Sequence, residues 1–449
     1  MSTVALIAVA VSGIAILLVL VAVVKLEAFV SLILTSMIVA LLAGIPLTEI
    51  IGAIEDGMGG TLGAIAIIIG FGSMFGEMLR VSGGTRQLAT TLVDSFGEQW
   101  APWAMGLTGF LVSISVFFDV GLIVLLPLAY SLTQRSGRSL LYYALPLGAG
   151  LAATHAYIPP TPGPTAIAAE LGVDLGWVIL FGIIAGIPAL GVGGIVFSRF
   201  IAQRIHIPVP ENVREDEEDA EDNPNPPSFA LVISLILFPL VLILIGTLTT
   251  VVLPEGSAVR NFFAFAGHPF TALLLASILV FYVLGVRRGR SMEEVQKIAT
   301  KSLEPVALVL LVTGAGGVFG NVLQQSGVGE AIANLMSGSG LPPILLAFLI
   351  ATMVRVAQGS ATVSMVTAAG LVAPAIQQQG LSAPAVGLIA IAIASGATVL
   401  SHVNDSGFWL VNRFLDMSVA DTLKSWTVSV TLVGLTGFLV VFVLSFFIQ

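Results

Sequence analysis

The stretch Ser401-His402-Val403-Asn404-Asp405-Ser406-Gly407 places a histidine, a carboxylate and a glycine inside an otherwise apolar part of the chain. In a lipid bilayer a charged side chain costs roughly 2.5 to 3.5 kcal/mol on insertion scales. Irregular backbone is tolerated at that depth only where protein or a water-filled cavity satisfies its polar groups. The stretch therefore predicts a transmembrane helix that is interrupted to form a working site.

The composition around this stretch is that of a polytopic membrane protein. Hydrophobic residues make up 57% of the 449 residues and charged residues only 10%, and the mean hydropathy is +1.04. Apolar runs near the ~20 residues that span a bilayer cover residues 3–24, 28–44, 61–79, 229–253, 269–286, 304–319 and 427–448. The first run lacks a basic leading region, so we expect a transmembrane helix there rather than a cleaved signal peptide.

An acidic segment divides the chain into two halves. Residues 211–222 contribute a charge of −7 to the formal net charge of −9, and a proline-rich stretch follows at residues 223–227. Such a segment is typical of a solvated linker, although a regulatory element is the alternative. The chain has no cysteine, which excludes disulfides and thiolate chemistry.

The two halves resemble each other. Residues 70–79 (GFGSMFGEML) align with residues 314–323 (GAGGVFGNVL), and a Ser-Gly pair follows each without a gap. His155 aligns with His402 when small insertions are allowed. Weak internal similarity of this kind is typical of transporter repeats, and the glycines favour close helix packing.

The basic residues predict how the chain crosses the membrane. Placing them inside, as the positive-inside rule directs, leaves residues 45–59 outside and makes residues 102–132 a re-entrant hairpin with its tip at 117–121. The matching hairpin, residues 342–376, has its tip near 355–362. We therefore expect an all-α fold of two inverted-topology repeats, each with a re-entrant hairpin and an interrupted transmembrane helix, with ten crossings in all.

These assignments divide the chain into five predicted segments. They are two N-terminal helices (1–60), the first repeat (61–198), an acidic cytoplasmic linker (199–228), two connecting helices with a cytoplasmic loop (229–303) and the second repeat (304–449).

Two residues are candidates for carrying a proton. Asp119 is the only acid between Glu98 and Glu170, and burial favours the neutral form of a carboxyl group; capping of a half-helix is the alternative. His155 could exchange protons near neutral pH, although a buried histidine is also a common structural group.

Hydroxyl, amide and charged groups cluster at the four breaks, where half-helix N-termini favour an anionic solute. Arg355 could hold a carboxylate, or instead pair with a nearby acid or with hairpin carbonyls. Asp405 could bind a coupling cation or substrate hydroxyls. The candidate substrate-binding residues are Ser115, Thr161, Thr165, Arg355, Gln358, Ser360, Thr362, His402, Asn404 and Asp405.

Enzymatic functions find little support. No Gly-Lys dipeptide follows the glycine-rich stretches and no HExxH motif occurs, so neither a phosphate-binding loop nor a zinc protease is expected. We expect no catalytic residue, no metal site and no cofactor.

Several longer motifs together resemble the gluconate permease (GntP) family of proton symporters, and the likeness runs nearly end to end. They are residues 57–63 (GMGGTLG), 159–167 (PPTPGPTAI), 359–363 (GSATV), 401–405 (SHVND) and 407–409 (GFW). The resemblance implies transport of gluconate or related sugar acids, and of D-serine in some members. Asp119 stands where the family commonly has Glu, Thr161 where it often has His, Gln358 where an apolar residue is usual and Ser406 where Pro is common.

Together, the residues and the resemblance predict an inner-membrane symporter that imports a small hydroxylated monocarboxylate with protons. Its expected partners are this gluconate-like anion, H+ and the lipid bilayer, with no nucleic acid; a homodimer is an open possibility. The alternatives are sodium coupling, another hydroxy acid such as D-serine, a passive facilitator, and a membrane sensor that uses the acidic linker.

Overall fold

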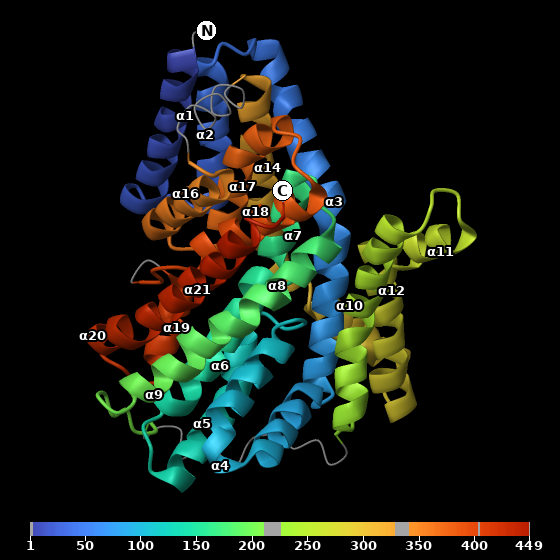
Figure 1. Cartoon of the computed structure of the whole chain (residues 1–449), viewed down its shortest axis with the longest axis vertical. Helices are drawn as coiled ribbons and strands as arrows, with labels where there is room; N and C mark the ends of the chain where they lie inside the picture. The colour runs from blue at the N-terminus through green and yellow to red at the C-terminus, as the bar shows by residue number, and fades with distance from the viewer. Residues whose placement is uncertain (1–2, 211–225, 328–340, 403–404, 449) are drawn as a thin grey trace.

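The fold is all-α in every part of the chain that the structure describes (Figure 1). The structure is a computed structural model that describes residues 3–210, 226–327, 341–402 and 405–448. The acidic segment at 211–222 lies outside these residues. The predicted helical membrane protein is therefore confirmed at the level of fold class.

The first half consists of nine helices among the described residues. They are α1 (Thr3–Leu18), α2 (Ala28–Leu42), α3 (Leu47–Val81), α4 (Gly84–Val112), α5 (Phe118–Ser136), α6 (Leu141–Tyr157), α7 (Pro162–Leu171), α8 (Leu175–Ala189) and α9 (Phe197–Ile201). A π-helical segment, Leu190–Val196, joins α8 to α9.

The second half begins with a unit that stands to one side of α3 (Figure 1). This unit is α10 (Phe229–Val252), α11 (Ala258–Ala266) and α12 (Pro269–Val280). The remaining helices are α13 (Met292–Lys301), α14 (Glu304–Gln325), α16 (Pro343–Gln358), α17 (Ala361–Gln378), α18 (Ala383–Gly396), α19 (Ser406–Phe414), α20 (Val419–Thr422) and α21 (Val428–Leu444).

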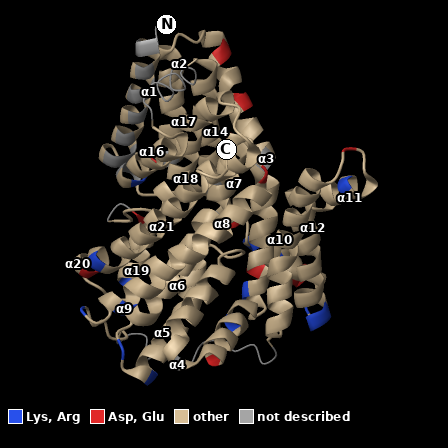
Figure 2. Ribbon diagram, in the orientation of Figure 1, with Lys and Arg blue, Asp and Glu red and all other residues tan. Residues whose placement is uncertain are grey.

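Six helical stretches among the described residues are long and apolar enough to cross a membrane. They are Leu47–Val81, Leu175–Ile201, Phe229–Val252, Pro269–Arg288, Val306–Gln325 and Val419–Leu444. Figure 2 shows α8, α10 and α21 without a charged residue along their length. Such stretches fit the hydrocarbon thickness of a bilayer.

Helices α6, α17 and α18 form the interior of the molecule. Nearly every residue of α6 and of α18 is buried, and α17 is buried continuously from Val363 to Ile376. A helix that is apolar on all sides belongs inside a bundle rather than at its surface. These helices therefore carry the chain breaks at their ends into the centre of the protein.

Four chain breaks occur in the same order in the two halves. In the first half, α4 breaks before α5 and α6 breaks before α7; in the second half, α16 breaks before α17 and α18 breaks before α19. The breaks fall at the positions that the polar and proline-rich stretches predict. The inverted orientation of the repeats stays a prediction.

Helix α3 differs from the expected pattern because it begins well before its apolar run. Residues 45–59 were expected to form an outside connection, yet the helix starts at Leu47 and passes through residue 60 without a break. Pro46 is the N-cap residue, and Glu49 lies in the first turn, where a negative charge is favourable. The apolar run therefore marks only part of the helix.

A glycine fixes the position of the first hairpin tip against α3. A Cβ atom at Gly76 would lie 1.6 Å from the Ser115 carbonyl oxygen, which belongs to the segment between α4 and α5. The two backbones can approach this closely only because Gly76 has no side chain. This contact holds the segment that leads into α5 against α3.

Candidate binding site at the chain breaks

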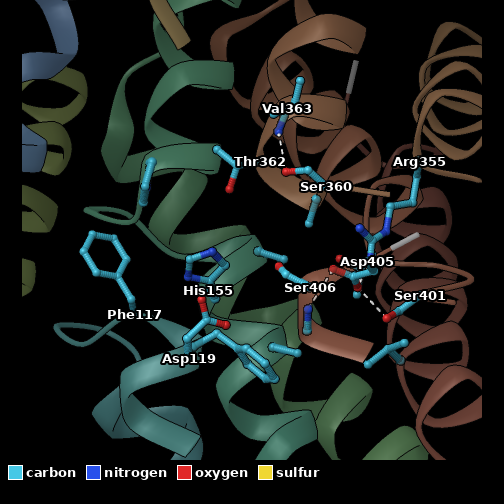
Figure 3. A pocket seen from close by; sticks show the side chains of 18 of the residues that line it. Phe117, Asp119, His155, Arg355, Ser360, Thr362, Val363, Ser401, Asp405 and Ser406 are labelled. Atoms are coloured by element: carbon cyan, nitrogen blue, oxygen red, sulfur yellow. Dashed lines mark hydrogen bonds and ion pairs between the residues drawn. The ribbon is translucent and has the colours of Figure 1, made fainter. Parts of the chain in front are cut away.

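The four chain breaks surround one cavity of about 470 Å³ (Figure 3). Its lining includes the first residue of each following half-helix, namely Phe118 of α5, Pro162 of α7, Ala361 of α17 and Ser406 of α19. Helix N-termini carry unpaired N–H groups and a partial positive charge. All four breaks therefore direct positive helix ends to the same space.

The two half-helices of the second half are capped by their own side chains. The Ser360 hydroxyl accepts a hydrogen bond from the Val363 N–H at 3.4 Å, and the Asp405 carboxylate accepts one from the Gly407 N–H at 3.0 Å. In the first half, Phe117 and Thr161 occupy the cap positions and make no capping hydrogen bond. The N-terminus of α5 is thus the least satisfied end, because Pro162 and Pro164 in the first turn of α7 have no N–H group that would need a partner.

Arg355 and Asp405 form a buried ion pair on one wall of the cavity. The Arg355 Nη2 lies 2.5 Å from Asp405 Oδ2, and the same guanidinium donates to the Gly359 carbonyl oxygen. Asp405 Oδ2 also accepts from the Ser401 hydroxyl at 2.5 Å. Ser401 in turn accepts from the Trp426 indole N–H at 2.9 Å. Both of the structural partners considered for Arg355, an acid and a hairpin carbonyl, are therefore present.

Asp119 and His155 lie together on the opposite wall (Figure 3). Asp119 stands in the first turn of α5 and is exposed to the cavity. Its carboxylate has no hydrogen bond or ion pair among the described residues. The His155 ring stands edge-on to Phe117 at 6.3 Å, and its Nδ1 atom is buried without a hydrogen-bond partner in the described part of the chain. This wall thus carries titratable groups that are not neutralised.

Ser360 and Thr362 also line the cavity, so that six predicted residues meet there. Other predicted residues lie elsewhere. The Thr165 hydroxyl donates to the Thr161 carbonyl oxygen, the Thr161 hydroxyl donates to the Ile158 carbonyl oxygen, and both distances are 2.7 Å. Local backbone bonds of this kind occupy the hydroxyl groups that the sequence offered as ligands.

The last predicted residues are outside the cavity lining or outside the described part of the chain. The His402 Nε2 atom lies 3.0 Å from the Val356 carbonyl oxygen, and Ser115 faces α3 through its carbonyl group. Asn404 and the side chain of Gln358 lie outside what the structure describes. A substrate role for these residues stays a prediction.

The cavity also has lining residues that were not among the predicted site residues. Phe117 and Phe118 lie in the hairpin tip, and Trp426 lies far along the chain, with its ring 5.4 Å from that of Phe118. Aromatic residues in an apolar sequence give no local signal that separates a cavity wall from ordinary packing. Ser401 belongs to the polar stretch 401–407, and its position could have predicted it as a hydrogen-bond partner of Asp405.

Membrane-length helices around a buried cavity at helix breaks define the class of protein, which is a membrane transporter. The chain belongs to the GntP permease family, because the family model described as GntP family permease matches residues 4–447. This result confirms the resemblance found in the sequence motifs.

Curated relatives cover nearly the whole chain. The low-affinity gluconate transporter of Escherichia coli (strain K12) is 40% identical over 98% of each chain. The high-affinity gluconate transporter of the same organism is 38% identical over 95% of this chain and 96% of the relative. The inner membrane permease YgbN, also from that strain, is 41% identical over 98% of each chain. The protein is therefore an inner-membrane permease.

Solved transporter structures share the fold at low sequence identity. The YdaH transporter of Alcanivorax borkumensis matches with a TM-score of 0.65 at 15% identity, covering 93% of this chain and 98% of that chain. MtrF of Neisseria gonorrhoeae matches with a TM-score of 0.69 at 14% identity, covering 94% and 95%. This likeness concerns the fold alone.

Proposed function

We propose that this permease is a secondary active transporter that imports gluconate, or a related small hydroxylated monocarboxylate, together with protons by alternating access. The relatives named gluconate transporters support the choice of substrate. The observation that carries the proposal is the presence of two uncapped helix N-termini and an unpaired carboxyl group in one cavity.

The substrate carboxylate binds at the uncapped N-terminus of α5; α7 adds its dipole and the N–H of Gly163, because Pro162 and Pro164 have no N–H group. Anions are stabilised at helix N-termini by the free N–H groups and by the helix dipole. Arg355 already pairs with Asp405 and Gly359, so its charge acts on the substrate only in part. This assignment differs from a site in which Arg355 alone holds the carboxylate.

Hydroxyl groups on the remaining walls orient the rest of the substrate. Ser360, Thr362 and Ser406 all line the cavity, and a hydroxyl group can both donate and accept hydrogen bonds. A cavity of about 470 Å³ lies within the usual range of roughly 300 to 1,000 Å³ for small-molecule sites. The volume suits a small molecule, and the hydroxyl groups favour a sugar acid over an apolar solute.

Asp119 couples the proton to the substrate through charge. Arg355 and Asp405 neutralise each other, and Glu27, the third acid in the lining, caps α2. An ionised Asp119 therefore adds an unpaired negative charge to the cavity, which opposes a second anion. Protonation of Asp119 removes that charge and makes room for the substrate carboxylate. Proton and substrate then bind and leave together, which is what symport requires.

Uptake into proteoliposomes tests the proposal. We expect radiolabelled gluconate to accumulate when an inward proton gradient is imposed, and to equilibrate without accumulation when no gradient exists. Accumulation that follows an imposed sodium gradient and ignores protons would overturn the proton coupling. Equilibration under every gradient would instead identify a passive facilitator.

A further inference from the structure

A second polar cavity of about 190 Å³ lies between α3, α7, α14 and α17, apart from the site described above. Its lining residues are mostly glycine and polar residues, and Asp56 and Glu170 are the only titratable groups among them. Asp56 is exposed and Glu170 is half-buried. The cavity thus leads from the surface to one carboxyl group between four helices.

Glu170 is held by a single hydrogen bond. The Thr61 hydroxyl donates to Glu170 Oε1 at 2.9 Å, and no ion pair to this carboxyl group exists among the described residues. Three uncharged polar residues, Asn321, Gln324 and Gln377, also line the cavity. Gln377 donates to the backbone carbonyl oxygen of Glu170 at 3.2 Å rather than to its carboxylate. A negative charge on Glu170 therefore has no cationic partner in the described structure.

Glycines shape the space around this carboxyl group. A Cβ atom at Gly317 would lie 1.9 Å from Thr61 Oγ1, and a Cβ atom at Gly320 would lie 3.2 Å from Glu170 Oε2. The chain thus leaves room for the carboxyl group and its hydroxyl partner by omitting side chains from the facing helix. Oε2 faces this glycine surface and has no described hydrogen-bond donor.

The position of Glu170 within its helix also disfavours a charge. Glu170 lies in the last turn of α7, which ends at Leu171. The unpaired carbonyl groups and the negative dipole end of a helix C-terminus repel a carboxylate. An alkali cation would need about six oxygen ligands, as other hard cations do, whereas in the described part of the chain the carboxylate has the Thr61 hydroxyl as its one hydrogen-bond partner. A proton satisfies the group with fewer contacts.

We infer that Glu170 is a second proton-binding site of this permease, at the opposite end of α7 from the substrate cavity. A proton that enters past Asp56 binds Oε2 and converts the carboxylate to a carboxylic acid, while Oε1 continues to accept from Thr61. Pro162, the first residue of α7, lines the substrate cavity. One short helix therefore connects the two sites.

Infrared difference spectroscopy in response to pH tests the site directly, and it does not depend on the substrate. We expect the wild-type protein to show a carboxylic C=O band that disappears in E170Q. The band should move in frequency in Thr61→Val, which removes the hydrogen bond and keeps the side-chain shape. The matched control E293Q changes an exposed acid on α13 and should leave the band in place.

Asp119 is a second source of such a band, and D119N identifies its contribution. A spectrum that is unchanged in both E170Q and Thr61→Val would overturn the inference. If E170Q fails to fold, the Thr61→Val spectrum decides the question alone.

The consequence for transport rests on the proposed function. In reversal-potential measurements, E170Q should still transport gluconate but should move one proton fewer per substrate than the wild type. An unchanged ratio together with the loss of the infrared band would show that Glu170 binds a proton without driving uptake, and would overturn the transport consequence alone.

Discussion

Arg355 and Asp405 are 50 positions apart in the chain and form an ion pair at 2.5 Å between the second hairpin and the second interrupted helix. Their side chains are only 4% and 11% exposed. The pair therefore ties together two chain breaks that would otherwise be free to separate. Asp405 adds a hydrogen bond to the first turn of α19, so that one carboxylate both pairs with the hairpin and caps the helix.

Removing one partner of this pair should destabilise the protein strongly. Asp405→Ala leaves the Arg355 charge buried and unpaired, which typically costs about 3 to 5 kcal/mol. We expect the thermal unfolding midpoint of Asp405→Ala in detergent to be clearly lower than that of the wild type. The double variant Arg355→Met with Asp405→Leu should recover much of the stability but not the transport. A single variant as stable as the wild type would contradict this reading.

Asp119→Asn should separate exchange from accumulation. The amide keeps the shape of the side chain but cannot release a proton, so accumulation should fall at least to what a proton at Glu170 alone can drive, while counterflow exchange of gluconate continues. Asp94→Asn is the matched control, because Asp94 is an exposed acid on α4. Normal accumulation by Asp119→Asn would move the proton role to another residue.

Gly76→Ala should disturb the first hairpin although it removes no interaction. The added methyl group would meet the Ser115 carbonyl oxygen at 1.6 Å, and overpacking of this kind typically costs about 1 to 3 kcal/mol. Gly63→Ala on the same helix is the control, because a Cβ atom there has nothing within 4 Å. We expect a lower unfolding midpoint and slower uptake for Gly76→Ala only.

Helix α13 is not one of the membrane-length helices, and acid should destabilise its N-terminus. Hydrogen bonds from the Ser291 backbone N–H and from its hydroxyl group lower the pKa of Glu294 in the capping box of this helix. Because the folded pKa is lowered, the stabilisation is present above the ordinary glutamate range and is lost as pH falls through the lowered value. Hydrogen exchange of peptides from α13 should therefore quicken in acid.

Ser291→Ala is the comparison for this effect. In Ser291→Ala the amide hydrogens of α13 should exchange faster at neutral pH than in the wild type. Their exchange should also depend less on acid, because the hydrogen bond of the Ser291 hydroxyl in the capping box is absent. Equal protection of α13 in the two proteins at all pH values would contradict the prediction.

The positions of the chain breaks could be predicted from the sequence because their cause is local. Proline at Pro162 and polar residues at Ser360 and Asp405 interrupt apolar runs, and a broken helix begins again at or beside each of them. The local ion pair of Glu77 and Arg80, three positions apart, was predictable for the same reason and is present at 2.6 Å.

The partners of these residues could not be predicted, because they come from distant parts of the chain. Nothing near Arg355 indicates that Asp405 will neutralise it, and nothing near Glu170 indicates that Thr61, 109 positions away, will donate to it. Hydroxyl groups such as that of Thr165 were also ambiguous, since a helix backbone competes with a ligand for the same hydrogen bonds.

The unequal capping of the half-helices bears on the empty carrier. Helices α17 and α19 are completed by Ser360 and Asp405, so the second half can keep its shape with nothing bound. The N-terminus of α5 obtains no such help from its own side chains, so its free N–H groups need water or the bound solute as partners. The resting transporter should therefore be stiff on one side of its cavity and pliant on the other, and the solute itself would complete the pliant side.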